Sequence, residues 1–143
     1  SSTQVRRYRS RISGPILDRI DLHLEVPAVR YEDLRSATPA ETSTAIRERV
    51  VAARERQLER FASDRIYSNA MMKPRHIKKY CQLDDTCLRL LEQATERLGL
   101  SARTYHRILK VARTIADLDL QDAIAPHHLL EAIQYRCLDR RVT

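Results

Sequence analysis

Glycine and the larger aromatic residues are scarce in this sequence of 143 residues, which contains 2 Gly, 1 Phe and no Trp. Long stretches rich in Ala, Leu, Arg and Glu favour helices over a β-sandwich or a β-barrel. The two glycines, Gly14 and Gly99, lie far apart, so the chain contains no glycine-rich loop of the kind that cradles nucleotide phosphates. The length fits one compact, mainly α domain.

Cysteine is also scarce, and Cys81, Cys87 and Cys137 form an odd set without C-x-x-C spacing. Neither a disulfide framework nor a four-ligand zinc site is indicated, and we expect reduced, buried thiols. His127 and His128 are adjacent, which places them about 100° apart on a helix and makes them poor joint metal ligands. We expect them on the surface at a helix start, and we expect no metal.

Long apolar runs are absent: none reaches the length of a signal peptide or of a membrane span. We therefore expect no membrane partner and a cytoplasmic location. Acidic residues are outnumbered, with 19 Asp and Glu against 26 Lys and Arg, a net charge of +7 and a sequence pI near 9.7. This balance favours an anionic partner such as nucleic acid or nucleotide phosphates, and a solvated arginine-rich surface is the alternative.

The N-terminal part combines a basic stretch with a single strand pattern. Residues 1–13 could form a helix that Gly14-Pro15 ends. Residues 20–26 then alternate between apolar and polar, which predicts a half-buried strand ended by Pro27. One strand cannot satisfy its own backbone, so its partners are expected outside this sequence, in the missing N-terminal part of a larger protein. Pairing between two copies is the alternative.

Four main helices and one short helical turn are predicted after a linker at residues 29–43. The helices span about 44–61, 85–98, 102–117 and 126–137, and the turn lies at 76–81. Asp84 or Asp85 and then Ser101 are the expected N-caps, Gly99 the left-handed C-cap and Pro126 the first residue of the last helix. The residues expected to face inward are Ile46, Val50, Ala53, Leu58, Phe61, Leu88, Leu91, Ala94, Thr95, Leu98, Tyr105, Ile108, Leu109, Ala112, Ile115, Ala116, Leu129, Leu130, Ile133 and Cys137.

Two groups of cations could contact phosphate. Arg103, Arg107 and Lys110 follow i, i+4 and i+7 spacing along one face of the helix after Ser101, and Arg103 could reach an anion docked at the helix N-terminus. A solvated basic face is the alternative. Arg19 stands at the entrance to the predicted strand after a rigid Gly-Pro approach, and here the alternative is a surface ion pair of Arg19 with Asp18 or Asp21.

Residues 8–22 (YRSRISGPILDRIDL) and 100–116 (LSARTYHRILKVARTIA) resemble the C-terminal part of the magnesium-chelatase-like AAA+ ATPases of the ComM or YifB competence group. The resemblance covers essentially the whole chain. It implies a helical bundle of the C-terminal lid type, preceded by one orphan β-strand from a truncated α/β ATPase core. Residues 1–28 would end the core, 29–43 would be a linker and 44–143 the lid, with the Walker A and Walker B segments upstream of Ser1.

The resemblance also implies roles for three arginines. Arg19 would be the arginine finger that reaches the γ-phosphate of ATP on the neighbouring subunit. Arg103 would be the sensor-2 arginine that contacts the nucleotide, and Arg107, one helical turn further along, is a weaker candidate. The implied whole protein is a homo-hexameric ring that uses ATP and Mg²⁺ to act on DNA, as a branch-migration helicase does in natural transformation. The chain alone would be inactive and hold no cofactor, and nothing in it supports metal insertion into porphyrin.

Two functions of other classes remain open. A helix-turn-helix module would use the helix after Ser101 for recognition, with Arg103, Arg107, Lys110 and Arg113 facing DNA. This reading leaves the strand at residues 20–26 without a role. A helical protein-interaction domain would instead direct its basic patch toward an acidic partner.

Overall fold

The computed structural model describes residues 7–8, 11–29, 31 and 41–136, and its elements there are helical, which confirms the mainly α fold. The helices are α2 (Gly14–Leu17), α4 (Ser43–Arg60), the 3-10 helix η1 (Asn69–Met71), α5 (Pro74–Tyr80), α6 (Asp85–Leu98), α7 (Ala102–Leu118) and α8 (Pro126–Gln134). The Gly-Pro pair begins α2 instead of ending a helix, because proline is tolerated in a first turn. Most of the basic stretch 1–13, and most of the linker 29–43, lies outside the described residues.

The strand expected at residues 20–26 is not assigned in the structure. Residues 20–29 have no regular secondary structure, and the side chains of Leu22, Leu24 and Val26 are exposed. The described residues contain no strand with which this segment could pair. Because a strand is defined by hydrogen bonds to a partner, its formation beside another part of a longer protein stays a prediction.

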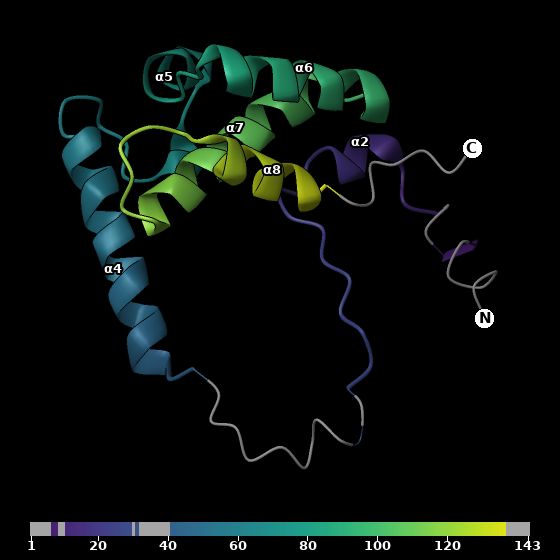
Figure 1. Ribbon diagram of the computed structural model, residues 1–143, viewed down its shortest axis with the longest axis horizontal. Helices are drawn as coiled ribbons and strands as arrows, with labels where there is room; N and C mark the ends of the chain where they lie inside the picture. Colours follow the sequence, from purple (N-terminus) through teal and green to yellow (C-terminus); the bar gives the residue numbers. More distant parts are fainter. Residues whose placement is uncertain (1–6, 9–10, 30, 32–40, 137–143) are drawn as a thin grey trace.

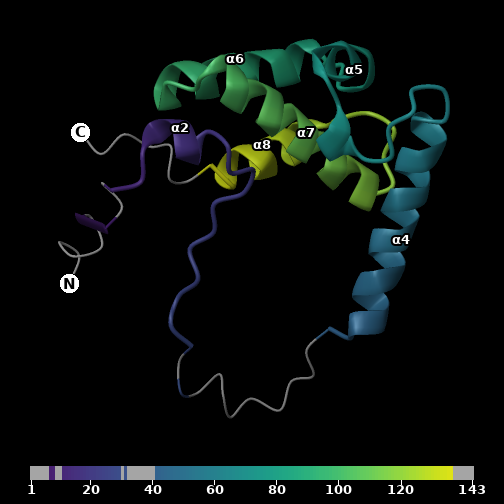
Figure 2. The same cartoon turned by 180° about the vertical axis from the view of Figure 1, so that it is seen from behind.

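Helix α7 is the centre of the bundle. It packs against α8, α4, α5 and η1, and α6 packs against α8. Figures 1 and 2 show α7 beneath α5 and α6, with α8 alongside it and α4 at one end of the bundle. The predicted apolar face of α7 is confirmed, since its buried residues include Ile108, Leu109, Ala112, Ile115 and Ala116.

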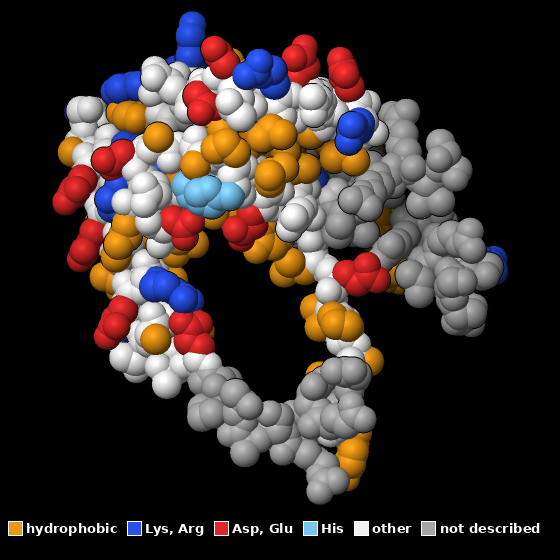
Figure 3. Space-filling model, in the orientation of Figure 1, with side chains coloured by type: hydrophobic (Ala, Val, Ile, Leu, Met, Phe, Trp, Pro, Cys, Tyr) orange, Lys and Arg blue, Asp and Glu red, His pale blue; other side chains and the backbone are white. Residues whose placement is uncertain are grey.

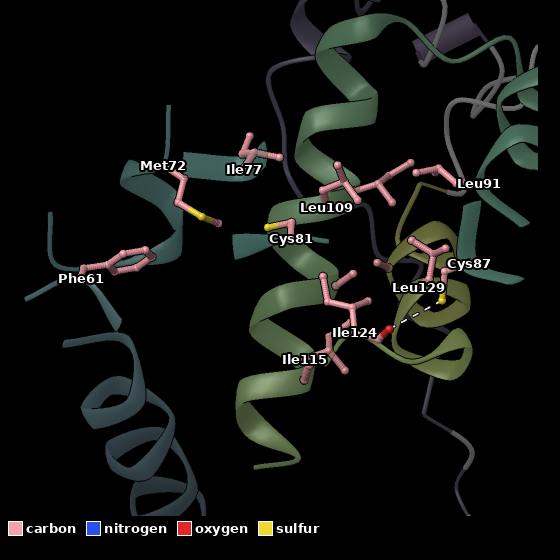
Figure 4. Close-up of a cluster of buried hydrophobic side chains, with 14 of the residues drawn as sticks. Phe61, Met72, Ile77, Cys81, Cys87, Leu91, Leu109, Ile115, Ile124 and Leu129 are labelled. Atoms are coloured by element: carbon pink, nitrogen blue, oxygen red, sulfur yellow. Dashed lines mark hydrogen bonds between the residues drawn. The ribbon is translucent and has the colours of Figure 1, made fainter. Parts of the chain in front are cut away.

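The hydrophobic core gathers around α7 from every side of the bundle. Figure 4 shows Phe61, directly after α4, and Met72, directly after η1, together with Ile77 of α5 and Leu129 of α8. These side chains are all at most 4% exposed. Burying such side chains is the main favourable contribution to the free energy of folding.

The two described cysteines belong to this core, as predicted, while Cys137 lies outside the described residues. The Sγ atom of Cys87 lies 3.6 Å from the carbonyl oxygen of Ile124, which precedes α8. Burial raises the pKa of the Cys81 and Cys87 thiols to about 11. Both therefore behave as packing residues at neutral pH.

Several residues predicted to face inward are exposed. On α4, Ile46, Val50 and Leu58 are 44–48% exposed, and the buried residues of this helix are Ala53 and Gln57. Only the second half of α4 lies against the bundle, and its first turns project away from it (Figures 1 and 2). Leu88 on α6 and Leu130 on α8 are similarly exposed. Figure 3 shows hydrophobic side chains gathered on the surface in the region of these two helices. Helical periodicity identifies an apolar stripe but not how much of it finds a partner.

The predicted caps of α6 and α7 are confirmed. The Asp84 carboxylate accepts a hydrogen bond from the Cys87 amide at 2.7 Å, which makes Asp84 the N-cap. Gly99 ends α6 with a φ of 62°, in the left-handed region that favours glycine. The Ser101 Oγ then accepts a hydrogen bond from the Thr104 amide at 3.2 Å and begins α7.

A buried polar network ties α4 and η1 to α7. The fully buried Asp117 carboxylate accepts hydrogen bonds from Arg113 Nε at 3.2 Å, from Asn69 Nδ2 at 2.8 Å and from both terminal nitrogens of Arg60, one of them at 2.8 Å. Burial lowers the pKa of Arg113, and the negative charge of Asp117 opposes that shift. The arginine charges thus share one carboxylate inside the bundle.

Candidate nucleotide-contacting site

The two sequence motifs that carry the family resemblance lie side by side. Residues 17–21, here called the Arg19 loop, begin at the last residue of α2 and dock on the first turn of α7. Ser101 Oγ donates a hydrogen bond to Asp18 Oδ2 at 3.0 Å, and Thr104 Oγ1 donates to Asp18 Oδ1 at 3.2 Å. Figures 1 and 2 show α2 beside the end of α6, where α7 begins. The loop is therefore anchored on the helix that carries Arg103.

The loop is also held from the other side, by α8 and the residues after it. Arg136, which is 1% exposed, donates hydrogen bonds to the carbonyl oxygens of Ile20 and of Leu17, the latter at 3.4 Å. These two carbonyls stand on either side of Arg19 in the sequence. Just after the loop, the His23 amide donates a hydrogen bond to the Tyr135 carbonyl at 2.7 Å. The backbone around Arg19 is therefore fixed at several points.

Arg19 and Arg103 are both exposed, and neither side chain makes a hydrogen bond or an ion pair within the part of the chain that the structure describes. The alternative of a surface ion pair between Arg19 and Asp18 or Asp21 is wrong. The Asp18 carboxylate accepts hydrogen bonds from two hydroxyls, and the Asp21 carboxylate pairs with Arg107. Both guanidinium groups are thus available to an external anion.

Arg107 and Lys110 share the face predicted for them, but they are engaged within the protein. Arg107 is paired with Asp21, and its side chain is only 25% exposed. Lys110 Nζ donates a hydrogen bond to the Ala70 carbonyl at 2.8 Å, and burial lowers its pKa. Both line a hollow of about 390 Å³ between α7, α8 and residues 21–22. Of the three cations predicted to line this face, Arg103 is therefore the one whose side chain is most accessible to an external anion.

The N-terminus of α7 already holds an anion. The Asp18 carboxylate occupies the position beside Ser101 and Thr104, where an external phosphate was expected to dock. A helix N-terminus favours negative charge, and a carboxylate of the chain itself satisfies that preference here. This position on the helix end is therefore occupied by the chain's own carboxylate, and the exposed Arg103 side chain extends from the same first turn of α7.

Arg113 is buried, which contradicts its predicted place on a DNA-facing surface. It is 2% exposed, and besides Asp117 it donates hydrogen bonds to the carbonyl oxygens of Gln121 and Asp122, each at 2.6 Å. This part of the helix-turn-helix interpretation is wrong, because an arginine enclosed by these acceptors cannot reach a DNA groove.

A cluster of Asp119, His127 and His128 has ligand atoms within 4.8 Å of one another. Histidines are visible on the face drawn in Figure 3, but His128 itself is fully buried, contrary to the surface position predicted for it. Its Nδ1 accepts a hydrogen bond from the Ala125 amide at 2.9 Å, so in the neutral ring Nε2 carries the hydrogen and faces Asp119 Oδ2 at 3.1 Å. Metal binding at Nε2 would move this hydrogen to Nδ1 and break the bond from the Ala125 amide, through which His128 caps α8.

Sequence reasoning did not identify Asp18 and Arg136 as residues that hold the Arg19 loop in place. Asp18 lies inside a motif chosen for Arg19, and nothing in the spacing indicates contacts with residues 83 and 86 positions away. Arg136 falls within the range predicted for the last helix, but α8 ends at Gln134, and nothing in the sequence pattern singles out Arg136. Among the helices that the structure describes, none is both long enough and apolar enough to cross a membrane.

Two protein-family models match the chain. The model described as "Magnesium chelatase, subunit ChlI C-terminal" matches residues 40–136. The model described as "Magnesium chelatase, subunit ChlI" matches residues 1–34. The first match contains α4 to α8, and the second contains the Arg19 loop.

Curated relatives match nearly the whole chain. An uncharacterized protein YifB of Salmonella typhimurium is 46% identical over 138 residues, which are 96% of this chain and 26% of that protein. The competence protein ComM of Haemophilus influenzae is 45% identical over 141 residues, or 98% of this chain and 27% of that protein. An uncharacterized protein YifB of Escherichia coli is 44% identical over 138 residues, with 96% and 26% covered. The chain thus spans about a quarter of the length of these relatives.

Proposed function

Because the chain belongs to the magnesium chelatase ChlI C-terminal family, as its sequence motifs predicted, we propose that it is the C-terminal part of a longer AAA+ ATPase and supplies Arg19 and Arg103 to ATP hydrolysis. One observation carries this proposal. The Arg19 loop is anchored on the first turn of the helix that bears Arg103, and both arginines remain exposed. ATP and Mg²⁺ are the cofactors that the family implies for the whole protein.

The two arginines have the chemistry that phosphoryl transfer requires. Negative charge on the γ-phosphate oxygens is stabilised by a cation held in place before the reaction, so a fixed guanidinium lowers the barrier. The anchored backbone around Arg19 supplies such a fixed cation, in the role of an arginine finger toward the neighbouring subunit. Arg103 extends from the first turn of α7, and its planar fork suits phosphate oxygens, in the role of sensor 2.

The finger role requires a second subunit, so the proposal includes a homo-hexameric ring whose sites are completed between neighbours. DNA is the proposed substrate of the ring, and the whole protein is proposed to move along it as a branch-migration helicase in natural transformation. A net charge of +7 and the 45% identity to a competence protein support DNA as the partner. The exposed apolar residues Ile46 and Val50 on α4 also favour a contact with further protein.

Kinetics of the longer protein test the two arginine roles. Arg19→Ala should lower the kcat for ATP hydrolysis by about a hundredfold or more, because an arginine finger acts on the transition state. Arg103→Ala should lower kcat/KM by about tenfold or more, which corresponds to the loss of one charge-assisted contact. Arg47→Ala, which removes an exposed arginine from α4, is the matched control and should keep normal turnover. Normal turnover in either of the first two variants removes that residue from the site.

The 143-residue chain alone separates this proposal from a DNA-reading module. We expect no ATP hydrolysis by it, and we expect DNA binding that is weak, sensitive to salt and independent of sequence. Sequence-selective binding of duplex DNA would instead support a recognition helix. Fluorescence anisotropy with two unrelated duplexes over a range of salt concentrations makes the distinction.

A further inference from the structure

We propose that Asp18 is a positioning residue that sets the direction of Arg19 by clamping its loop to the first turn of α7. The inference rests on the function proposed above and adds a residue to it. Asp18 directly precedes Arg19, and each of its carboxylate oxygens accepts one hydroxyl hydrogen bond, from Ser101 at 3.0 Å and from Thr104 at 3.2 Å. The clamp therefore uses both oxygens of the carboxylate.

The hydrogen-bond pattern shows why a carboxylate suits this position. When Ser101 and Thr104 both point their hydroxyl hydrogens at Asp18, a lone pair of Ser101 Oγ stays free for the Thr104 amide, from which it accepts at 3.2 Å. Asp18 thus fixes the loop and orients the N-cap of α7 in one arrangement. The positive end of the helix dipole also favours the negative charge of the carboxylate.

The side of the clamp that α7 provides is rigid. Thr104 is 1% exposed, and α7 is the helix on which most of the bundle packs. The loop has no such framework on its C-terminal side, because residues 22–29 have no regular secondary structure. Its other fixed points are Arg136 on the backbone carbonyls and Arg107 on Asp21. Asp18 is the residue next to Arg19 whose own side chain ties the loop to α7.

The steady-state kinetics of the longer protein test this role. Asp18→Ala removes both hydrogen bonds and should lower kcat by about ten- to a hundredfold, the effect of misplacing a catalytic group by about 1 Å, with little change in the KM for ATP. Asp18→Asn keeps one oxygen acceptor and should fall between Asp18→Ala and wild type. Asp85→Asn, an exposed aspartate in the first turn of α6, is the matched control and should keep normal turnover.

The Thr104 hydroxyl, which donates to Asp18, allows an independent test of the same contact. Thr104→Val keeps the shape of the side chain but removes its donor to Asp18, so kcat should fall while Arg19 and its loop are unchanged in sequence. Thr104→Ser restores the hydroxyl and should recover more activity than Thr104→Val. Thermal unfolding of every variant identifies any loss that comes from misfolding alone.

A double-mutant cycle with Arg19 decides the case. If Asp18 acts through Arg19, Asp18→Ala should change kcat by less than about twofold in a protein that already carries Arg19→Ala, as measured by single-turnover hydrolysis. If the two losses multiply, or if Asp18→Ala leaves kcat at the wild-type value, the positioning role is overturned while the function of Arg19 stands. If Arg19→Ala itself hydrolyses ATP normally, the proposed function of Arg19 fails as well.

Discussion

Asp117 provides a direct test of how the bundle is held together. Its carboxylate is fully buried and shared by Arg60, Arg113 and Asn69. Asp117→Asn leaves the shape of the side chain intact but leaves two arginines without their counter-charge. Breaking a buried ion pair from one side typically costs about 3–5 kcal/mol of unfolding free energy. For a chain of this length each 1 kcal/mol shifts the melting temperature by roughly 3 °C, so we expect a fall of about 10–15 °C.

The assay is thermal unfolding of the full chain at neutral pH, followed by the circular dichroism of its α-helices at 222 nm. Asp122→Asn is the matched control, because Asp122 also pairs with an arginine, Arg56, but its side chain is fully exposed. Its melting temperature should stay close to that of the wild type. A fall for Asp117→Asn no larger than that of the control would refute the reasoning, since the network would then contribute no more than a surface pair.

Three further predictions concern the two buried cysteines, His128 and Gly99. Burial raises the pKa of the Cys81 and Cys87 thiols to about 11, so in a Cys137→Ser background both should react with a thiol reagent at pH 8 only after denaturation. Rapid labelling of the native chain would contradict their burial. Burial and the neighbouring His127 lower the pKa of His128 below 6.5, so the folded state favours the neutral imidazole. The stability that this residue contributes should therefore be lost as the pH falls below about 6.5. An NMR titration that gives this imidazole a pKa at or above 6.5 would be inconsistent with the prediction. Gly99→Ala should lower the unfolding free energy by about 1–2 kcal/mol in urea, because φ is +62° while no atom lies within 4 Å of the added methyl group, and Gly99→Asn should cost less.

Local signals in the sequence were sufficient to predict the helices. Asp84, Ser101 and Pro126 mark helix starts, Gly99 marks an end, and each does so through contacts within a few residues. The apolar face of α7 was equally clear, because that helix is surrounded by partners. Capping and periodicity depend on residues that are close together in the chain, so a single sequence is sufficient to predict them.

Contacts between distant residues could not be predicted in this way. The clamp of Asp18 on Ser101 joins residues 83 positions apart, and Arg60 meets Asp117 across 57 positions. Periodicity also overstated burial where a stripe lacks a partner, as at Ile46 on α4 and Leu88 on α6. The strand expected at residues 20–26 also rests on a local pattern. Alternation shows which side chains are apolar but supplies no neighbouring strand.

The position of the bound nucleotide tests the central claim most directly. A structure of the longer protein with a non-hydrolysable ATP analogue and Mg²⁺ should place guanidinium nitrogens of Arg19 and of Arg103 about 3 Å from phosphate oxygens. The Asp18 carboxylate should remain on Ser101 and Thr104 in that structure. Phosphates bound at a distance from both arginines, for example in the hollow beside Arg107 and Lys110, would contradict the account.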